Sequence, residues 1–189
     1  VEDSWVVLFS HPADFTPVCT TELGQVQKLL PEFTRRNVKI IGLSINTVDD
    51  HKKFLRDISD SQGIDITFPI IADEGGSLAR QLGMVHPEAP GTGGGAMTIR
   101  SLLIIDPSKK LCLRMSYPAS TGRNFDEVIR CIDSLQVAAT HPVGTPANWQ
   151  VGEDVVILPS VEEVEADAVF SKGFVSITPY LRVTPQPDP

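Results

Sequence analysis

The stretch that decides the fold is Ser10-His11-Pro12-Ala13-Asp14-Phe15-Thr16-Pro17-Val18-Cys19-Thr20-Thr21-Glu22. It follows an apolar run typical of a buried strand, Trp5-Val6-Val7-Leu8-Phe9. Beyond it, apolar residues recur at helical spacing from Leu23 to Phe33. The sequence therefore predicts that a strand passes directly into a helix at this point.

The start signals of the predicted helix place a cysteine in its first turn. Thr16 is a good N-cap and Pro17 suits the first helical position, so Cys19 falls at the third. There the sulfur would lie over unpaired backbone N–H groups at the positive end of the helix dipole, which favours thiolate over thiol. Cys19 is therefore a candidate nucleophile. The alternative is a packing role, because free cysteine is often buried.

Composition restricts the class of protein. The 189 residues are 41% hydrophobic and carry a formal net charge of -8, with no basic run, which argues against a nucleic-acid partner. No apolar stretch approaches the roughly 20 residues that a transmembrane helix needs, and no leader pattern opens the chain. Three cysteines, an odd number, argue against a disulfide framework and favour a reducing compartment. We expect a cytoplasmic protein that acts on small substrates.

Strands and helices alternate through most of the chain. Further strands are predicted at residues 38–45, 68–72, 98–105 and 111–117, and further helices at 49–58, 77–82 and 124–137. Pro31 should interrupt the first helix, and a turn-rich link makes the last two strands an antiparallel hairpin. This order predicts an α/β domain with a thioredoxin-like fold, a central mixed sheet flanked by helices, over residues 1–139.

The character of the sequence changes near Thr140. Prolines recur, acidic residues cluster at 162–167, and a strand at 154–158 and a helix at 161–170 are predicted. We expect a small C-terminal extension over residues 140–189. An extension too small for a core of its own would pack on another surface, such as a second subunit.

A glycine-rich segment lies between two predicted elements, the helix at 77–82 and the strand at 98–105. Residues 91–96 follow the pattern Gly-x-Gly-x-x-Ala, which occurs in dinucleotide-binding sites. That fingerprint requires a strand before it and a helix after it, whereas here a proline-containing loop precedes it and a predicted strand follows. We therefore expect a connector or the rim of an active site.

Cys19 has no second thiol nearby in the sequence. Position 22 is Glu22, which excludes a Cys-x-x-Cys motif. A lone thiolate indicates attack on an electrophile such as a peroxide oxygen, with a sulfenic acid as the product. Cys112 lies in a predicted strand and Cys131 in a predicted helix, and we expect both to be packing residues.

The frame Pro-x-x-x-Thr-x-x-Cys, formed by Pro12, Thr16 and Cys19, resembles the active-site signature of the peroxiredoxins. The wider string 10–22, together with residues 117–127, is similar to the one-cysteine, peroxiredoxin-6-like class. The resemblance runs from about residue 4 to residue 187.

This resemblance implies a thiol-dependent peroxidase that reduces hydrogen peroxide and organic hydroperoxides without metal, haem or flavin. Cys19 would be the peroxidatic nucleophile, and Thr16 would hydrogen-bond the thiolate and the incoming peroxide. Pro12 would shield the sulfur from water, and Arg100 would hold Cys19 as a thiolate.

Three supporting residues follow from the same resemblance. His11 is similar to the histidine beside the pocket, and Glu22 with Arg123 is similar to a buried pair that steadies the helix turn and Arg100. His11 could equally be a hydrogen-bonded residue at the end of a strand. The other histidines are expected on the surface: His51, His86 and His141. No spacing of histidine and cysteine suggests a metal site.

The sulfenic acid would need a thiol from outside the chain, because no cysteine follows Cys131. The resemblance implies glutathione, with or without a glutathione transferase, or another small thiol. We also expect a homodimer, supported by the C-terminal extension from Thr140. The alternative function is a redox sensor or chaperone that is switched by oxidation of Cys19.

The sequence departs from the class at a second motif. Some members carry Gly-x-Ser-x-Gly and a phospholipase activity, whereas here the string is Glu2-Asp3-Ser4-Trp5-Val6, without either glycine. The position of their aspartate is occupied by Ser108. The chain also begins later than the family's domain and is short between Val175 and Tyr180. These departures argue against a lipase.

Overall fold

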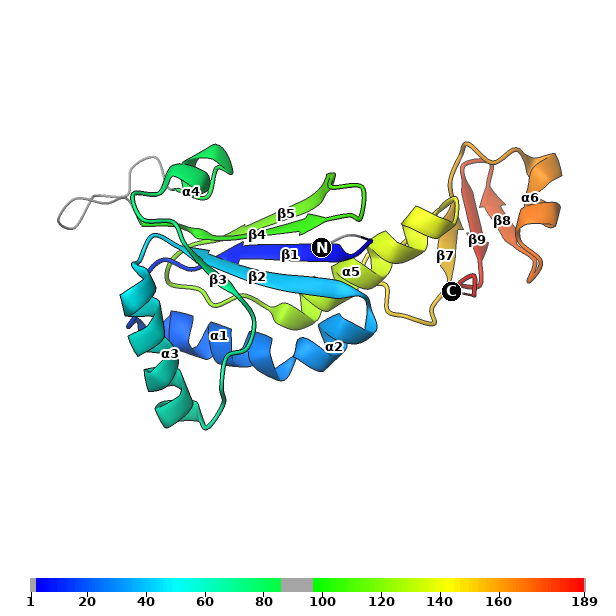
Figure 1. Ribbon diagram of the computed structural model, residues 1–189. Coiled ribbons are helices and arrows are strands. Elements are labelled where there is room, and N and C mark those ends of the chain that lie inside the picture. The colour runs from blue at the N-terminus through cyan, green and yellow to red at the C-terminus, as the bar shows by residue number, and fades with distance from the viewer. Residues whose placement is uncertain (1–2, 86–96, 189) are drawn as a thin grey trace. The chain divides into compact units, whose positions relative to one another are not determined.

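The computed structural model describes residues 3–85 and 97–188. The chain divides into two compact units, residues 1–125 and 126–189, whose elements are drawn in Figure 1. The predicted domain boundary at residue 139 falls within helix α5 (Phe125–Thr140) and stays a prediction. His86 and the glycine-rich residues 91–96 lie outside the described residues.

A five-stranded mixed sheet forms the centre of the first unit. Its strands are β1 (Trp5–Ser10), β2 (Val38–Ser44), β3 (Ile70–Ala72), β4 (Arg100–Ile105) and β5 (Leu111–Tyr117). They lie in the order β3-β2-β1-β4-β5. β1, β2 and β3 are parallel, and β4 runs antiparallel to β1 and β5. The predicted mixed sheet is confirmed, and so is the predicted antiparallel hairpin, which β4 and β5 form.

Helices cover both faces of this sheet. α1 (Pro17–Lys28), α2 (Leu30–Arg35) and α3 (Val48–Gln62) lie on one side, and α4 (Ser77–Gln81) lies on the other (Figure 1). Successive side chains of β1 point to opposite faces. Leu8 therefore joins a buried cluster with Ala79 of α4, whereas Phe9 packs against Phe68 with ring centroids 5.8 Å apart.

The proline in the first helical segment acts as predicted. α1 ends at Lys28, and α2 begins at Leu30 with a proline in its first turn. Proline is tolerated there because the first N–H groups of a helix have no intrahelical acceptor. One predicted helix is therefore two.

The second unit contains most of α5 and a four-stranded antiparallel sheet. Its other elements are β6 (Val143–Gly144), β7 (Val155–Ile157), α6 (Glu163–Val169), β8 (Val175–Thr178) and β9 (Leu181–Thr184). The strand order is β6-β7-β9-β8. Within the described residues, no helix is long and apolar enough to cross a membrane.

The expectation that the C-terminal extension lacks a core of its own is wrong. Trp149 is fully buried there in a cluster with Val155, Ile157 and Phe170. Its indole N–H donates to the carbonyl of Glu153 at 3.0 Å, so this large side chain is buried without an unpaired polar atom. The sequence reasoning missed this core because it is built around one tryptophan in an irregular segment.

Candidate active site

Cys19 lies in the first turn of α1, as predicted, and is 0% exposed. Thr16 is the N-cap residue and Pro17 begins the helix. The hydroxyl of Thr16 does not cap the helix. It turns back and donates to the carbonyl of Ala13 at 2.8 Å. Its lone pairs remain available to accept hydrogen bonds.

The turn before the helix has an unusual backbone. Phe15 has a φ of 57°, in the left-handed region that bulky residues rarely adopt. Its ring packs against Phe54 of α3, with centroids 5.5 Å apart. Backbone strain of this kind is common at functional sites, where the surrounding structure holds it in place. Here the turn leads the chain from the end of β1 into the helix that carries Cys19.

Arg100 reaches the sulfur from the first residue of β4. Its Nη1 lies 3.3 Å from Cys19 Sγ and 2.7 Å from Glu22 Oε2. Its Nε and Nη2 donate to the carbonyl of Ala119 at 3.0 and 2.7 Å. The guanidinium is thus fixed at three groups, and one of its N–H donors points at the nucleophile.

Glu22 joins Arg100 to Arg123. Its Oε1 accepts from the backbone N and the Nε of Arg123, and its Oε2 accepts from Arg123 Nη2, all at 2.8 Å. Burial acts to raise the pKa of Glu22, but the hydrogen bonds and charge of Arg123 outweigh it and hold this pKa below its usual range. Two buried guanidinium groups thus share one carboxylate, and one of them, that of Arg100, also contacts Cys19 Sγ.

Arg123 connects this cluster to the sheet. Its Nη1 donates to the carbonyl of Ser101 in β4 at 3.0 Å, and its guanidinium lies 5.0 Å from the ring centroid of Phe9. The structure therefore brings Cys19, Glu22, Arg100 and Arg123 together, as the sequence analysis expected for their positions.

A second buried polar cluster contains two residues that the sequence analysis missed, Asp14 and His51. Asp14 Oδ1 lies 2.7 Å from His11 Nε2, and Asp14 Oδ2 lies 2.6 Å from His51 Nδ1. The expectation that His51 is a surface residue is wrong, because it is only 6% exposed. Its spacing from Phe54 and Ile58, at i+3 and i+7, was the available signal of a buried helix face. His141, the remaining described histidine, is half-buried.

The other two cysteines lack an activating environment. Cys112 is exposed on β5, so the expected packing role is wrong for it, whereas Cys131 is buried as expected. Burial, followed by the Glu127 carboxylate, raises the pKa of Cys131 to about 11. Desolvation and the nearby Asp106 also raise the pKa of Cys112. Neither thiol is poised to act as a nucleophile near neutral pH.

The serine considered for a lipase has a different environment from a catalytic serine. Ser4 precedes β1 and donates its hydroxyl proton to Asn37 Oδ1 at 2.9 Å, an amide oxygen that cannot act as a general base. Ser108 lies in the turn between β4 and β5 and donates to Asp106 Oδ1 at 2.7 Å. The contact of Ser4 does not activate a nucleophile.

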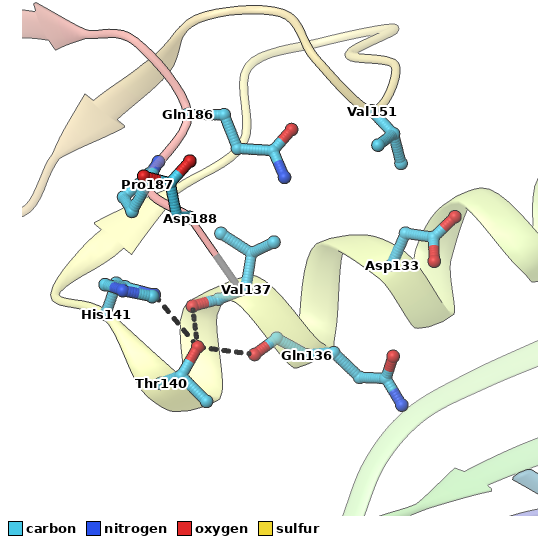
Figure 2. A pocket seen from close by; sticks show the side chains of 9 residues that line it. All are labelled: Asp133, Gln136, Val137, Thr140, His141, Val151, Gln186, Pro187 and Asp188. Carbon is cyan, nitrogen blue, oxygen red and sulfur yellow. Dashed lines mark hydrogen bonds between the residues drawn. The ribbon is translucent and has the colours of Figure 1, made fainter. Parts of the chain in front are cut away.

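A cavity of about 260 Å³ lies in the second unit, between the end of α5 and two loop segments (Figure 2). Its lining residues are Asp133, Gln136, Val137, Thr140, His141, Val151, Gln186, Pro187 and Asp188. Thr140 Oγ1 lies 2.9 Å from His141 Nδ1. The lining contains no cysteine and none of the predicted site residues.

Comparison with known proteins identifies the family of the chain. The AhpC/TSA family model matches residues 1–113, and the model of the C-terminal domain of 1-Cys peroxiredoxin matches residues 134–172. The chain is 49% identical to a 1-Cys peroxiredoxin of Dictyostelium discoideum, covering 98% of this chain and 76% of that protein. It is 52% identical to peroxiredoxin-6 of Rattus norvegicus, covering 98% and 87%.

Two solved peroxiredoxin structures are also similar to the chain over nearly its whole length. A cysteine-to-serine mutant of peroxiredoxin 6 from Arenicola marina superposes with a TM-score of 0.92 at 48% identity, covering 100% of this chain and 88% of the other. A yeast mitochondrial 1-Cys peroxiredoxin, described as resolved through glutathione and thioredoxin systems, gives 0.90 at 49%, covering 97% and 87%. The chain therefore belongs to the AhpC/TSA family and, within it, to the one-cysteine peroxiredoxins, which are thiol-dependent peroxidases.

Proposed function

We propose that Cys19 is the peroxidatic nucleophile and that it reduces hydrogen peroxide and organic hydroperoxides. The observation that carries this proposal is the 3.3 Å contact from Arg100 Nη1 to Cys19 Sγ, made at a helix N-terminus and completely shielded from solvent. The thiolate attacks the terminal peroxide oxygen, and the O–O bond breaks. The products are the sulfenic acid of Cys19 and an alkoxide, or hydroxide, which takes a proton to become the alcohol or water.

Arg100 and Thr16 assist this step in different ways. Negative charge develops on the peroxide oxygens as their bond breaks, and the fixed N–H groups of Arg100 stabilise it more than they stabilise the ground state. The hydroxyl proton of Thr16 is donated to the carbonyl of Ala13, so its oxygen acts only as an acceptor and is available to the second O–H of hydrogen peroxide. Pro12 is buried in the same segment and shields the sulfur from water.

Regeneration of Cys19 uses a thiol from outside the chain. The sulfenic acid reacts with one thiol to give a mixed disulfide and water, and a second thiol releases Cys19 and a disulfide. We infer glutathione, free or delivered by a glutathione transferase, or another small thiol. The raised pKa of Cys131 argues against this residue as a resolving thiol. All three cysteines are unpaired, which supports a reducing compartment such as the cytoplasm.

Intact-mass analysis after limited peroxide tests this function. One oxygen atom should be added, confined to Cys19, and glutathione should remove it and restore repeated consumption of peroxide. Stoichiometric oxidation without turnover in the presence of glutathione or another small thiol would instead indicate the redox sensor or chaperone. Oxidation confined to Cys112 or Cys131 would contradict the assignment of the nucleophile.

Replacing Arg100 with methionine should lower kcat/KM for hydrogen peroxide about 100-fold, the scale of losing one fixed donor to a developing negative charge. Methionine keeps much of the side-chain volume and removes the N–H groups that contact Sγ and Glu22. Stopped-flow peroxide reduction measures the effect. Arg56→Met, on the exposed side of α3, is the control and should keep the parent value. Equal values for the two variants would contradict the role of Arg100.

We infer a homodimer in which the second unit takes part. β8 is the edge strand of its sheet, and Val175, Ile177 and the adjacent Tyr180 are 65%, 61% and 78% exposed. An exposed apolar edge strand is normally covered by another chain or protected by charges. Nothing in this strand is charged.

Ile177→Asp should therefore convert the dimer to a monomer, because the new carboxylate would lie within the apolar contact. Light scattering after size exclusion should show the mass halved. The control is Val48→Asp, which places the same charge on an exposed residue at the N-terminus of α3, where a carboxylate is favourable. A monomeric parent protein, or an unchanged mass for Ile177→Asp, would contradict the inference.

A further inference from the structure

Almost every polar atom of His11, in the backbone and in the ring, has a hydrogen-bond partner. Its backbone N donates to the carbonyl of Leu43 at 3.0 Å, and its carbonyl accepts from Thr98 Oγ1 at 2.6 Å. Nε2 is hydrogen-bonded to Asp14 Oδ1, and the side chain is completely buried. Nδ1 alone has no partner among the described residues. A buried acceptor without a donor costs roughly 1–3 kcal/mol, so this atom requires an explanation.

Asp14 determines which nitrogen of His11 carries the proton. Burial acts to raise the pKa of Asp14, but hydrogen bonds from His11 and His51 outweigh it and lower this pKa. An ionised carboxylate only accepts hydrogen bonds, so His11 Nε2 and His51 Nδ1 must both be protonated. Asp14 is itself held by its backbone N, which donates to Asn46 Oδ1 at 3.0 Å.

The second nitrogen of His11 is therefore an unprotonated acceptor. Burial lowers the pKa of His11 more than Asp14 raises it, while His51 and Arg123 lower it further, so the imidazole is neutral near pH 7. A neutral ring with its proton on Nε2 presents a lone pair at Nδ1.

This acceptor belongs to the neighbourhood of Cys19. The antiparallel register of β1 and β4 ends with Phe9 opposite Leu102, and His11 and Arg100 each lie two residues beyond this pair in their own chain segments. Arg100 contacts the sulfur, and the charge of Arg123 acts on the His11 ring. An O–H donor bound near Arg100 and Cys19 would supply the partner that Nδ1 lacks.

We propose that Asp14 and His51 are positioning residues that hold His11 in the Nε2–H tautomer, so that Nδ1 accepts the O–H of the hydroperoxide at Cys19. This bond orients the O–O bond toward Sγ and leaves the N–H groups of Arg100 for the oxygen on which charge develops. The proposal rests on the proposed role of Cys19 as nucleophile.

The same three groups form a set that a zinc ion could use, since two imidazoles and a carboxylate are common zinc ligands. Such an ion would take His11 Nε2 and His51 Nδ1 and move their protons to His11 Nδ1 and His51 Nε2. Neither of these nitrogens has an acceptor among the described residues, whereas metal-bound histidines normally donate their second N–H. The geometry thus favours the hydrogen-bonded cluster.

Nitrogen-15 NMR of the histidine-labelled, unmodified protein tests the tautomers directly. The two rings should show opposite tautomers, with the proton on Nε2 in His11 and on Nδ1 in His51. A peroxide-sized alcohol, used as a probe in reduced protein, should shift the His11 Nδ1 resonance. A proton on His11 Nδ1, or stoichiometric zinc that remains after dialysis, would overturn the proposal even if every variant failed to fold.

Kinetics of matched variants test the function of the cluster. His11→Gln keeps a donor near the Nε2 position but has no Nδ1 acceptor, and it should lower kcat/KM for hydrogen peroxide about tenfold, the scale of one lost hydrogen bond. Asp14→Asn should lose a similar factor and change the tautomer of at least one ring. His51→Ala should also lose activity, and His51→Asn, whose amide N–H replaces Nδ1–H, should restore most of it.

The outcomes separate this proposal from the assignment of Cys19. If Asp14→Asn and His11→Gln keep the parent kcat/KM while Cys19→Ser is inactive, the positioning role is overturned and the nucleophile stands. If Cys19→Ser remains active, the nucleophile itself is wrong.

Discussion

Replacing Cys19 with serine should lower the rate of peroxide reduction by roughly 10⁴-fold or more, the scale on which enzymes lose activity when their nucleophile is removed. Serine has nearly the shape of cysteine, so the buried position in α1 and the contacts between Arg100 and Glu22 should persist. What is lost is the thiolate, because a serine hydroxyl stays protonated beside the same guanidinium. Peroxide consumption with excess glutathione measures the effect.

The matched control is Cys112→Ser. This thiol lies exposed on β5, and its raised pKa keeps it protonated near neutral pH, so the parent rate should be retained. Thiol counting after one equivalent of peroxide adds a second reading: the parent should lose the thiol of Cys19 and keep the other two. A Cys19→Ser variant that reduces peroxide at the parent rate would remove the basis of the proposed mechanism.

Much of the first unit could be predicted because its strands are continuous apolar runs bounded by turn residues. The run 111–117 became β5 with unchanged bounds, and Pro31 separated two helices where predicted. The β8–β9 hairpin was not predicted. Three of the four residues of β8 are exposed, so no burial pattern marks it as a strand. Its identity depends on pairing with β9, which a local pattern does not report.

The candidate site also contains residues that local sequence signals could locate and residues that they could not. Thr16, Pro17 and Cys19 carry local helix-start signals, so the nucleophile could be located from spacing alone. Arg100 is 81 residues away from Cys19, and only family resemblance indicated it. The cluster of His11, Asp14 and His51 escaped both approaches, because it forms where the end of β1 meets a helix 37 residues beyond Asp14. Long-range polar contacts of this kind have no periodic signature.

Replacing Glu22 with glutamine should destabilise the first unit by about 3–5 kcal/mol, the usual cost of removing one partner of a buried ion pair. Arg100 and Arg123 would remain buried without a carboxylate, and the amide NH₂ would face guanidinium donors. Urea unfolding followed by the fluorescence of Trp5, in a Trp149→Phe background, measures the effect. The control is Glu32→Gln, which also breaks contacts with two arginines but at the surface, where the loss should not exceed about 1 kcal/mol.

The pH dependence of the stability lost in Glu22→Gln provides the sharper test. The pKa of Glu22 is lowered in the folded protein, so the unfolded chain binds more protons and the stability it contributes is present above its ordinary pKa of 4.5. That contribution is lost as the pH falls below 4.5 and through the folded value. The difference in free energy of unfolding between the parent and Glu22→Gln should therefore be largest at pH 7 and should decrease as the pH falls below 4.5. A gap that stays constant down to pH 3, or equal losses for Glu22→Gln and Glu32→Gln, would show that the buried carboxylate does not hold the two arginines beside Cys19.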